Sequence, residues 1–180
     1  MPPALELLTE RLRLRTWRSE DEAGMAAINQ DPEVTRFLNR PVDPEAVAAF
    51  YALVTDHWAE HGFGLWVLET REPDTAGELI GFVGVRHPTF LPELAARPEL
   101  GWRLARRAWG RGLATEAAAA ARDHAFDTLG LPELISIIHA DNARSQRVAT
   151  TVGMTITQQV YNPVLDRDVD VWGLLRARHP

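Results

Sequence analysis

The spacing of apolar positions changes several times along the 180-residue chain. Residues 12–17 alternate apolar and charged side chains, which is typical of a half-buried strand. Residues 44–61 instead carry apolar side chains at helical spacing, and this predicts a long helix that ends at His61-Gly62. The apolar face of that helix would hold Val47, Phe50, Tyr51, Val54 and Trp58.

Capping signals predict where the N-terminal helices begin. The segment Ser19 to Glu22 has the residues of a capping box, which would start a helix that runs to about Asn29. Asp31-Pro32 and Asp43-Pro44 each place an N-cap residue before a proline at the first helical position. We expect the second of these pairs to open the long helix.

Two pairs of strands flank the centre of the chain. Phe63–Glu69 and Glu78–Arg86, which are joined by a turn rich in Pro, Asp and Gly, predict an antiparallel hairpin. Met154–Tyr161 and Val169–Leu175 predict a second hairpin near the C-terminus. Residues 87–98 contain three prolines and are expected to form a loop.

The centre itself, residues 99–140, has the pattern strand, loop, helix, strand. An apolar run ends at Leu104, and a basic loop with two glycines follows it. An alanine-rich helix is predicted from about Gly110 to Leu129, and the strand Leu134–Ala140 comes after it. This is a single βαβ unit among mainly antiparallel strands. A short helix is expected from about Asn142 to Val152.

The loop before the alanine-rich helix suits a bound pyrophosphate. The first N–H groups of a helix have no intrahelical partner, and the helix dipole is positive at that end. Gly110 and Gly112 let a bulky anion approach the backbone, while Arg106, Arg107 and Arg111 add positive charge. A tight strand-to-helix turn would explain the glycines equally well.

The loop and its flanks resemble a known family. Arg107-x-x-Gly110-x-Gly112, followed by Leu-Ala-Thr-Glu-Ala, is similar to the coenzyme A-binding motif of the GNAT acetyltransferase superfamily. Asn142-x-x-Ser145, Thr9–Trp17 and Asp31–Leu38 resemble its ribosomal-protein-type (RimJ/RimL-like) branch. The resemblance covers roughly residues 8–176 as one domain. It implies an α+β fold with a mixed, mostly antiparallel sheet, in which two central parallel strands splay apart and admit acetyl-CoA.

The resemblance also implies a reaction and a set of cofactor-binding residues. The chain would transfer an acetyl group from acetyl-CoA to a primary amine, either a protein N-terminal amine or the amine of a small molecule. Loops 40–44 and 87–98 would set the acceptor specificity. The residues expected to bind acetyl-CoA are Trp102, Arg103, Leu104, Arg107, Trp109, Gly110, Arg111, Gly112, Leu113, Ala114, Asn142 and Ser145.

Two residues are candidates for the acid and the base. Many enzymes of the family use a tyrosine a few residues after the position of Ser145, but here Gln-Arg-Val-Ala follows, so Ser145 or a water would protonate the leaving thiolate. Helix capping is the alternative for Asn142 and Ser145. Glu99 is the first candidate base, although an exposed strand-end carboxylate is equally expected there. His87 and Glu93 come next.

Two further histidines are expected to have no part in the reaction. We interpret His139, on the second strand of the central unit, as a structural residue, and His124 as a surface residue of the alanine-rich helix.

Composition narrows the mechanism and the partners. The chain has no cysteine, which excludes an acetyl-cysteine intermediate and favours direct attack within a ternary complex. All 19 basic residues are arginine, so the lysine-dependent phosphate loop is excluded. The net charge of −6 argues against nucleic acid as the main partner. No membrane span or leader segment is evident, so we expect a cytoplasmic protein, and we expect no metal. The sequence is compatible with a homodimer.

Two alternatives stay open. Gly110-x-Gly112 and Asp141 occur where a dinucleotide-binding enzyme would place its glycines and its ribose-binding acid, but Thr115 replaces the third glycine. The missing tyrosine is compatible with a non-catalytic acyl-CoA-binding module on the same fold. Turnover would separate this module from an enzyme.

Overall fold

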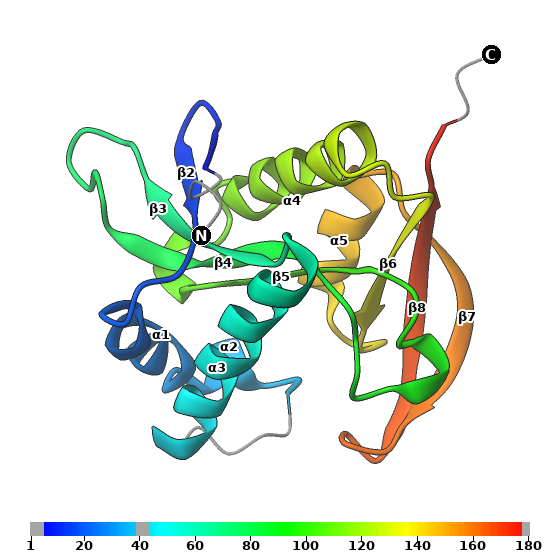
Figure 1. Ribbon diagram of the computed structural model, residues 1–180. Helices are drawn as coiled ribbons and strands as arrows, with labels where there is room; N and C mark the ends of the chain where they lie inside the picture. The colour runs from blue at the N-terminus through cyan, green and yellow to red at the C-terminus, as the bar shows by residue number, and fades with distance from the viewer. Residues whose placement is uncertain (1–5, 39–43, 178–180) are drawn as a thin grey trace.

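The computed structural model describes residues 6–38 and 44–177. Its strands form one eight-stranded sheet in the order β1-β2-β3-β4-β5-β6-β8-β7, in which only β5 and β6 are parallel neighbours (Figure 1). This confirms the mixed, mostly antiparallel sheet with one central βαβ unit, and both predicted hairpins. The strands are β1 (Leu7–Leu8), β2 (Leu12–Arg15), β3 (Leu65–Thr70), β4 (Leu79–Arg86), β5 (Glu99–Leu104), β6 (Glu133–Ile138), β7 (Thr155–Asn162) and β8 (Arg167–Leu175).

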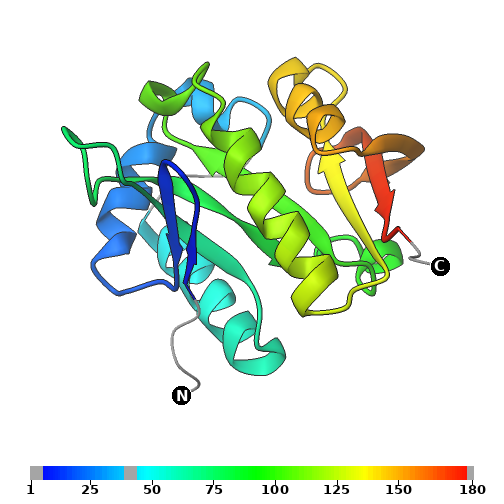
Figure 2. The ribbon, with the colours of Figure 1, turned by 90° about the horizontal axis from the view of Figure 1, so that it is seen from above.

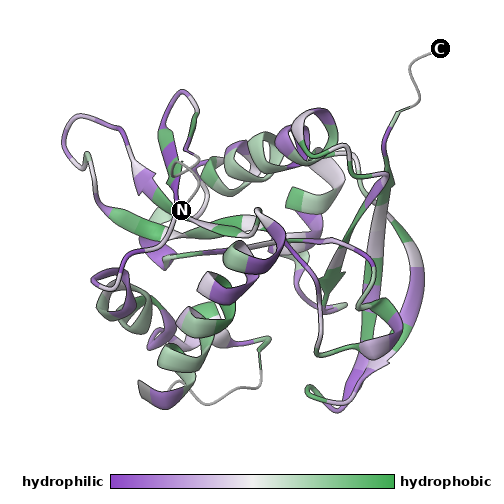
Figure 3. Ribbon diagram, viewed as in Figure 1, coloured by the Kyte–Doolittle hydropathy of each residue, from purple (hydrophilic) through white to green (hydrophobic). Residues whose placement is uncertain are grey.

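Helices cover both faces of the sheet (Figures 1 and 2). One apolar cluster lies between the sheet and α4 with α5, and a second lies between the sheet and α1 with α3. Most of the edge strand β7 is polar and exposed (Figure 3). Within the described ranges, no helix is long and apolar enough to cross a membrane. The helices are α1 (Asp21–Asn29), α2 (Pro32–Thr35), α3 (Pro44–His61), α4 (Leu113–Asp123) and α5 (Ala143–Thr151).

The alanine-rich helix α4 is shorter than predicted. It begins at Leu113 instead of Gly110, because Gly110 and Gly112 have φ values of 73° and 77°, which a right-handed helix does not contain. After Asp123 the backbone continues as a π-helical turn, His124–Thr128. Four alanines of this segment are completely buried, so the helix axis lies close to the sheet: Ala117, Ala118, Ala121 and Ala125.

The surface position predicted for His124 is wrong. Its side chain is buried, and its ring packs edge-on against Trp66 with the ring centroids 5.4 Å apart. The Nε2 atom has no hydrogen-bond partner among the described residues. Because burial disfavours the charged imidazolium, the pKa of His124 is lowered from its ordinary value.

The capping predictions have mixed outcomes. Asp31 caps α2 as expected, since its carboxylate accepts the N–H of Glu33. The capping box at Ser19 is wrong, because the N-cap residue of α1 is Glu20 and no side-chain cap bond forms in the described structure. Asp21 instead accepts two hydrogen bonds of 2.7 Å from the buried guanidinium of Arg15. Asp43 and residues 40–43 of the expected specificity loop lie outside the described residues.

Candidate active site

The parallel strands β5 and β6 separate soon after they meet. Their ladder contains only the pair Glu99 and Ile135, and a hydrogen bond of 2.6 Å from Ser136 Oγ to the carbonyl of Leu100 adds one more link. This confirms the predicted splay. Beyond Leu100, β5 therefore has an edge that β6 does not cover, and two cavities lie along it.

The two cavities meet in the middle of β5. The cavity at the start of β5, here called the Glu99 cavity, has a volume of about 290 Å³. The cavity at the end of β5, here called the Gly110 cavity, has a volume of about 330 Å³. Six residues line both of them: Phe37, Leu38, Trp102, Arg103, Asn142 and Ser145.

The start of α4 forms one wall of the Gly110 cavity. Its lining includes Gly110, Gly112 and the first turn of α4. The N-cap residue of α4 is Gly112, and no described side chain caps the helix, so its first N–H groups are open to a ligand. No described atom lies within 4 Å of the place where a Cβ on Gly110 would stand. This geometry suits an anion bound at a helix N-terminus.

The arginines of the loop mainly hold the loop in place. Arg107 Nε donates to Glu78 at 2.7 Å, and its Nη2 donates to the carbonyl of Leu79 at 2.8 Å. Arg111 pairs with Glu72. These contacts tie the loop to the turn between β3 and β4.

Two arginines of α5 line the Gly110 cavity, and sequence reasoning missed both. Arg144 stacks over Trp109 with its guanidinium carbon 4.1 Å from the ring centroid, and Arg147 lies one helical turn further on. Arg144 and Arg147 are three residues apart, so they share one face of the helix that begins at the Asn142-x-x-Ser145 motif. This spacing could have predicted that both lie near the cofactor. Trp109 also donates its indole N–H to the carbonyl of Leu104 at 2.9 Å.

Asn142 and Ser145 lie at the junction of the cavities. The carboxamide oxygen of Asn142 accepts the backbone N–H of Ser145 at 3.1 Å, so Asn142 caps α5. Capping was one of the two roles considered for this pair. Both residues also line both cavities, so their part in capping α5 is compatible with contact to a bound cofactor.

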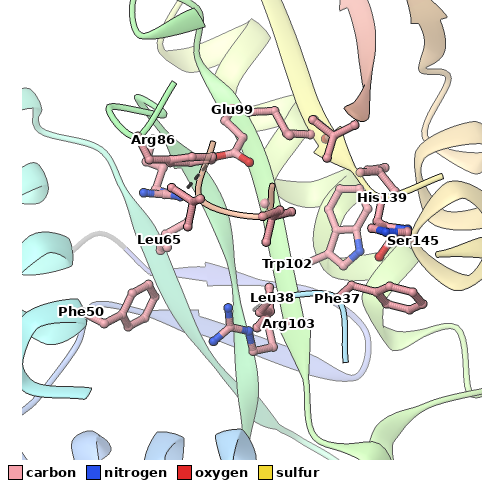
Figure 4. A pocket seen from close by; sticks show the side chains of 18 of the residues that line it. Phe37, Leu38, Phe50, Leu65, Arg86, Glu99, Trp102, Arg103, His139 and Ser145 are labelled. Carbon is pink, nitrogen blue, oxygen red and sulfur yellow. Dashed lines mark ion pairs between the residues drawn. The ribbon is translucent and has the colours of Figure 1, made fainter. Parts of the chain in front are cut away.

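An ion pair that contains a buried carboxylate lines the Glu99 cavity together with apolar side chains. Glu99 lies opposite Arg86 in the β4–β5 ladder, and Arg86 Nη2 is 3.3 Å from Glu99 Oε2. Glu99 is only 8% exposed, so the expectation of an exposed strand-end carboxylate is wrong. Figure 4 shows the Arg86–Glu99 pair, with Ser145 and His139 in another part of the view. Most of the remaining lining is apolar, including Phe37, Phe50, Phe82, Phe90, Leu165 and Val169.

Comparison with known proteins agrees with this geometry. The family model described as "Acetyltransferase (GNAT) domain" matches residues 11–155. The chain belongs to the GNAT acetyltransferase family. A crystal structure of an acetyltransferase from Agrobacterium tumefaciens has a TM-score of 0.81 and 31% sequence identity, with 94% of each chain covered.

Two further relatives of this GNAT domain are informative. FsC-acetyl coenzyme A-N(2)-transacetylase from Aspergillus fumigatus is 30% identical over 164 residues, which cover 87% of the present chain and 67% of the relative. The ribosomal-protein-S5-alanine acetyltransferase structure from Vibrio fischeri has a TM-score of 0.70 at 16% identity, with 96% and 97% of the two chains covered. At that identity the likeness shows the fold alone.

The two other candidate bases in this GNAT domain, His87 and Glu93, lie away from the cavities. His87 lies beside His57 and His61, and Glu93 is exposed on the short 3₁₀ turn Pro92–Leu94. Neither lines a cavity. Of the described residues, no tyrosine lines either cavity.

His139 lines the Glu99 cavity but has contacts that suit a structural residue. Its ring nitrogens lie 3.0 Å from the backbone N of Asp141 and 2.8 Å from a guanidinium nitrogen of Arg167. The ring also packs against Phe37, with the centroids 5.0 Å apart.

Proposed function

We propose that this GNAT domain transfers an acetyl group from acetyl-CoA to a primary amine by direct attack within a ternary complex. The observation that carries the proposal is the junction of two unlike cavities at Ser145. One has open backbone N–H groups at a helix N-terminus, and the other has a buried carboxylate. The printed name of the Aspergillus relative, which includes acetyl coenzyme A, supports the choice of cosubstrate.

Acetyl-CoA would occupy the Gly110 cavity. The N–H groups between Gly110 and Ala114 would bind its pyrophosphate, and the uncovered edge of β5 would bond its pantetheine amides. Arg144 and Arg147 would add positive charge there. The full proposed set is Trp102, Arg103, Leu104, Arg107, Trp109, Gly110, Arg111, Gly112, Leu113, Ala114, Asn142, Arg144, Ser145 and Arg147. All of these residues except Arg107 and Arg111 line the Gly110 cavity, and those two arginines would act by holding the loop in place.

The reacting groups would meet between the cavities. Glu99 takes a proton from the acceptor ammonium, directly or through a water, and the free amine attacks the thioester carbonyl carbon. A backbone N–H of β5 stabilises the negative charge on the carbonyl oxygen, which contributes about 3 kcal/mol. The C–S bond would then break as Ser145 Oγ or a water takes the remaining excess proton from the attacking nitrogen and gives its own proton to the thiolate of coenzyme A, so that Ser145 ends the step as a hydroxyl.

The lining of the Glu99 cavity favours an amine attached to a compact apolar group. Phenylalanines and aliphatic side chains form most of its wall, and the carboxylate of Glu99 is already balanced by Arg86. A polycation would therefore gain little there. An apolar N-terminal residue of a protein or a small apolar amine would bury its side chain against these residues.

Release of free coenzyme A thiol in the presence of acetyl-CoA and a panel of amines tests the proposal. We expect turnover with apolar primary amines and much less with spermidine. Ser145→Ala should lower kcat at least tenfold with an unchanged Kd for acetyl-CoA, whereas Ser145→Thr, which keeps a hydroxyl, should retain more activity. Tight acetyl-CoA binding without turnover on any amine would favour the non-catalytic module instead.

A further inference from the structure

We propose that His57, His61 and His87 form a binding site for a divalent transition metal of the zinc class. Each histidine offers one ring nitrogen, and these three atoms all lie within 4.8 Å of one another. The ring centroids are 4.4, 5.0 and 5.6 Å apart. The cluster is separate from both cavities, since none of the three residues lines them.

The sequence places these side chains together through two elements. His57 and His61 are four residues apart in the last turns of α3, so they project from the same face of the helix. His87 directly follows the last residue of β4. Phe63 packs against all three imidazole rings, with ring centroids between 5.3 and 5.9 Å away, and supplies an apolar wall.

Hydrogen bonds orient His57 as a ligand. Its Nδ1 lies 2.8 Å from the carbonyl of Phe63, which can only accept, so Nδ1 carries the proton and Nε2 keeps its lone pair. A metal-binding histidine is typically oriented in this way by a backbone carbonyl. The Nε2 atom accepts the backbone N–H of His87 at 3.1 Å, and a metal would compete with this bond.

His87 presents a nitrogen that the fold leaves without a partner. Its Nδ1 is buried and has no hydrogen bond within the part of the chain that the structure describes. Leaving a buried polar atom unsatisfied costs about 1 to 3 kcal/mol, and a metal ion would remove this cost. The unsatisfied nitrogen is therefore an observation that points to a ligand independently of the clustering.

The local charges favour a cation on balance. The cluster adjoins the C-terminus of α3, where the helix dipole is negative, and Glu60 Oε1 is 3.8 Å from His61 Nε2. The positive charge of Arg86, the residue before His87, opposes the binding of a cation.

The donor set selects the class of metal. Three imidazole nitrogens suit zinc, cobalt or copper, whereas calcium and magnesium prefer oxygen ligands. Tetrahedral Zn–N bonds of about 2.0 Å would bring the nitrogens to about 3.3 Å from one another. Small rotations of the side chains would therefore complete the site, and the metal would join the end of α3 to the end of β4.

Titration of the full-length chain with Co²⁺ and Zn²⁺ after chelator treatment tests the proposal. We expect a cobalt d–d spectrum with one equivalent of metal, and a rise in Tm of roughly 5 °C at saturating zinc, with no such rise in magnesium. His61→Ala should weaken zinc binding by about tenfold or more. The side chain of His61 is 30% exposed at the end of its helix, so this variant should fold.

Two variants make the result decisive. His139→Ala removes a histidine that contacts Asp141 and Arg167 and does not belong to the cluster, so it should leave zinc affinity unchanged. His61→Cys introduces the only thiol of the chain, so a thiolate-to-cobalt charge-transfer band would arise only if residue 61 binds the metal. Equal zinc affinity in the wild type and His61→Ala, or a folded His61→Cys variant without that band, would overturn the proposal.

Discussion

The two cavities along β5 are built in different ways. The Gly110 cavity takes much of its wall from one continuous segment, residues 102–115, which includes the N-terminus of α4 with its uncapped N–H groups. The Glu99 cavity takes its wall from side chains of α3, β4, β5, β6 and the loop after β7. A cosubstrate shared by a family can be bound by a short local motif, whereas an acceptor that varies between members is bound by scattered side chains. The predictions below test this division.

The largest effect is expected in the Glu99 cavity. Glu99→Gln keeps the shape of the side chain but removes the proposed base, so kcat/KM for the amine should fall by about a hundredfold. The Kd for acetyl-CoA should change little, because Glu99 does not line the Gly110 cavity. Steady-state kinetics beside a calorimetric titration with acetyl-CoA would measure both quantities.

Glu93→Gln is the matched control for this substitution. Glu93 is an exposed glutamate on the loop before β5 and lines neither cavity. It should leave kcat/KM within about twofold of the wild type. An equal loss in both variants would mean that Glu99 is not the base.

The second effect concerns the backbone of the Gly110 cavity. Gly110→Ala places a methyl group in the open space beside the helix N-terminus, so acetyl-CoA should bind about tenfold more weakly. The positive φ of 73° should also cost about 1 kcal/mol of stability. Thermal unfolding with and without acetyl-CoA separates the two effects.

Gly62→Ala supplies the same backbone strain elsewhere. Gly62 has a φ of 72° and, like Gly110, has no described atom within 4 Å of the point that a Cβ would occupy. It should lose a similar amount of stability and keep its affinity for acetyl-CoA. If both variants bound acetyl-CoA like the wild type, the loop would be only a tight turn.

The same division explains what the sequence could predict. The order of the elements, the splayed βαβ unit and the glycine loop follow from local patterns and from the resemblance to the family. The burial of His124 and the Arg86–Glu99 pair depend on long-range packing of the sheet, which periodicity does not reveal. At the start of α1, the side-chain bonds that form belong to Asp21 and not to the Ser19–Glu22 pair that local spacing favours. The carboxylate of Asp21 accepts the backbone N–H of Arg18 and two bonds from the buried Arg15.

The third effect concerns how much arginine side chains near the Gly110 cavity contribute to acetyl-CoA affinity. Arg147→Gln should weaken acetyl-CoA binding about fivefold, since a cation that lines the cavity is lost. Arg107→Gln should weaken it less than twofold, because Glu78 and the carbonyl of Leu79 already occupy the guanidinium of Arg107. Calorimetric titrations at two salt concentrations would measure both changes. A larger loss of affinity in Arg107→Gln than in Arg147→Gln would mean that Arg107 contacts the phosphates of acetyl-CoA directly.

The smallest effect concerns His124, which directly follows the last residue of α4. A change there should alter the stability of the protein without altering either cavity. Because burial lowers the pKa of His124 below its ordinary value of about 6.5, the unfolded chain takes up the proton first as the pH falls. The contribution of the neutral histidine is therefore fully present above about pH 6.5 and is lost as the pH falls from there towards its folded pKa. His124→Phe, which removes this titration, should reduce the loss of Tm between pH 7 and pH 5 by about 2 to 4 °C while the Kd for acetyl-CoA at pH 7 stays the same. Parallel acid dependence of Tm in the two proteins would show that His124 is protonated equally in the folded and unfolded chains, and a changed Kd would show that the two ends of α4 are coupled.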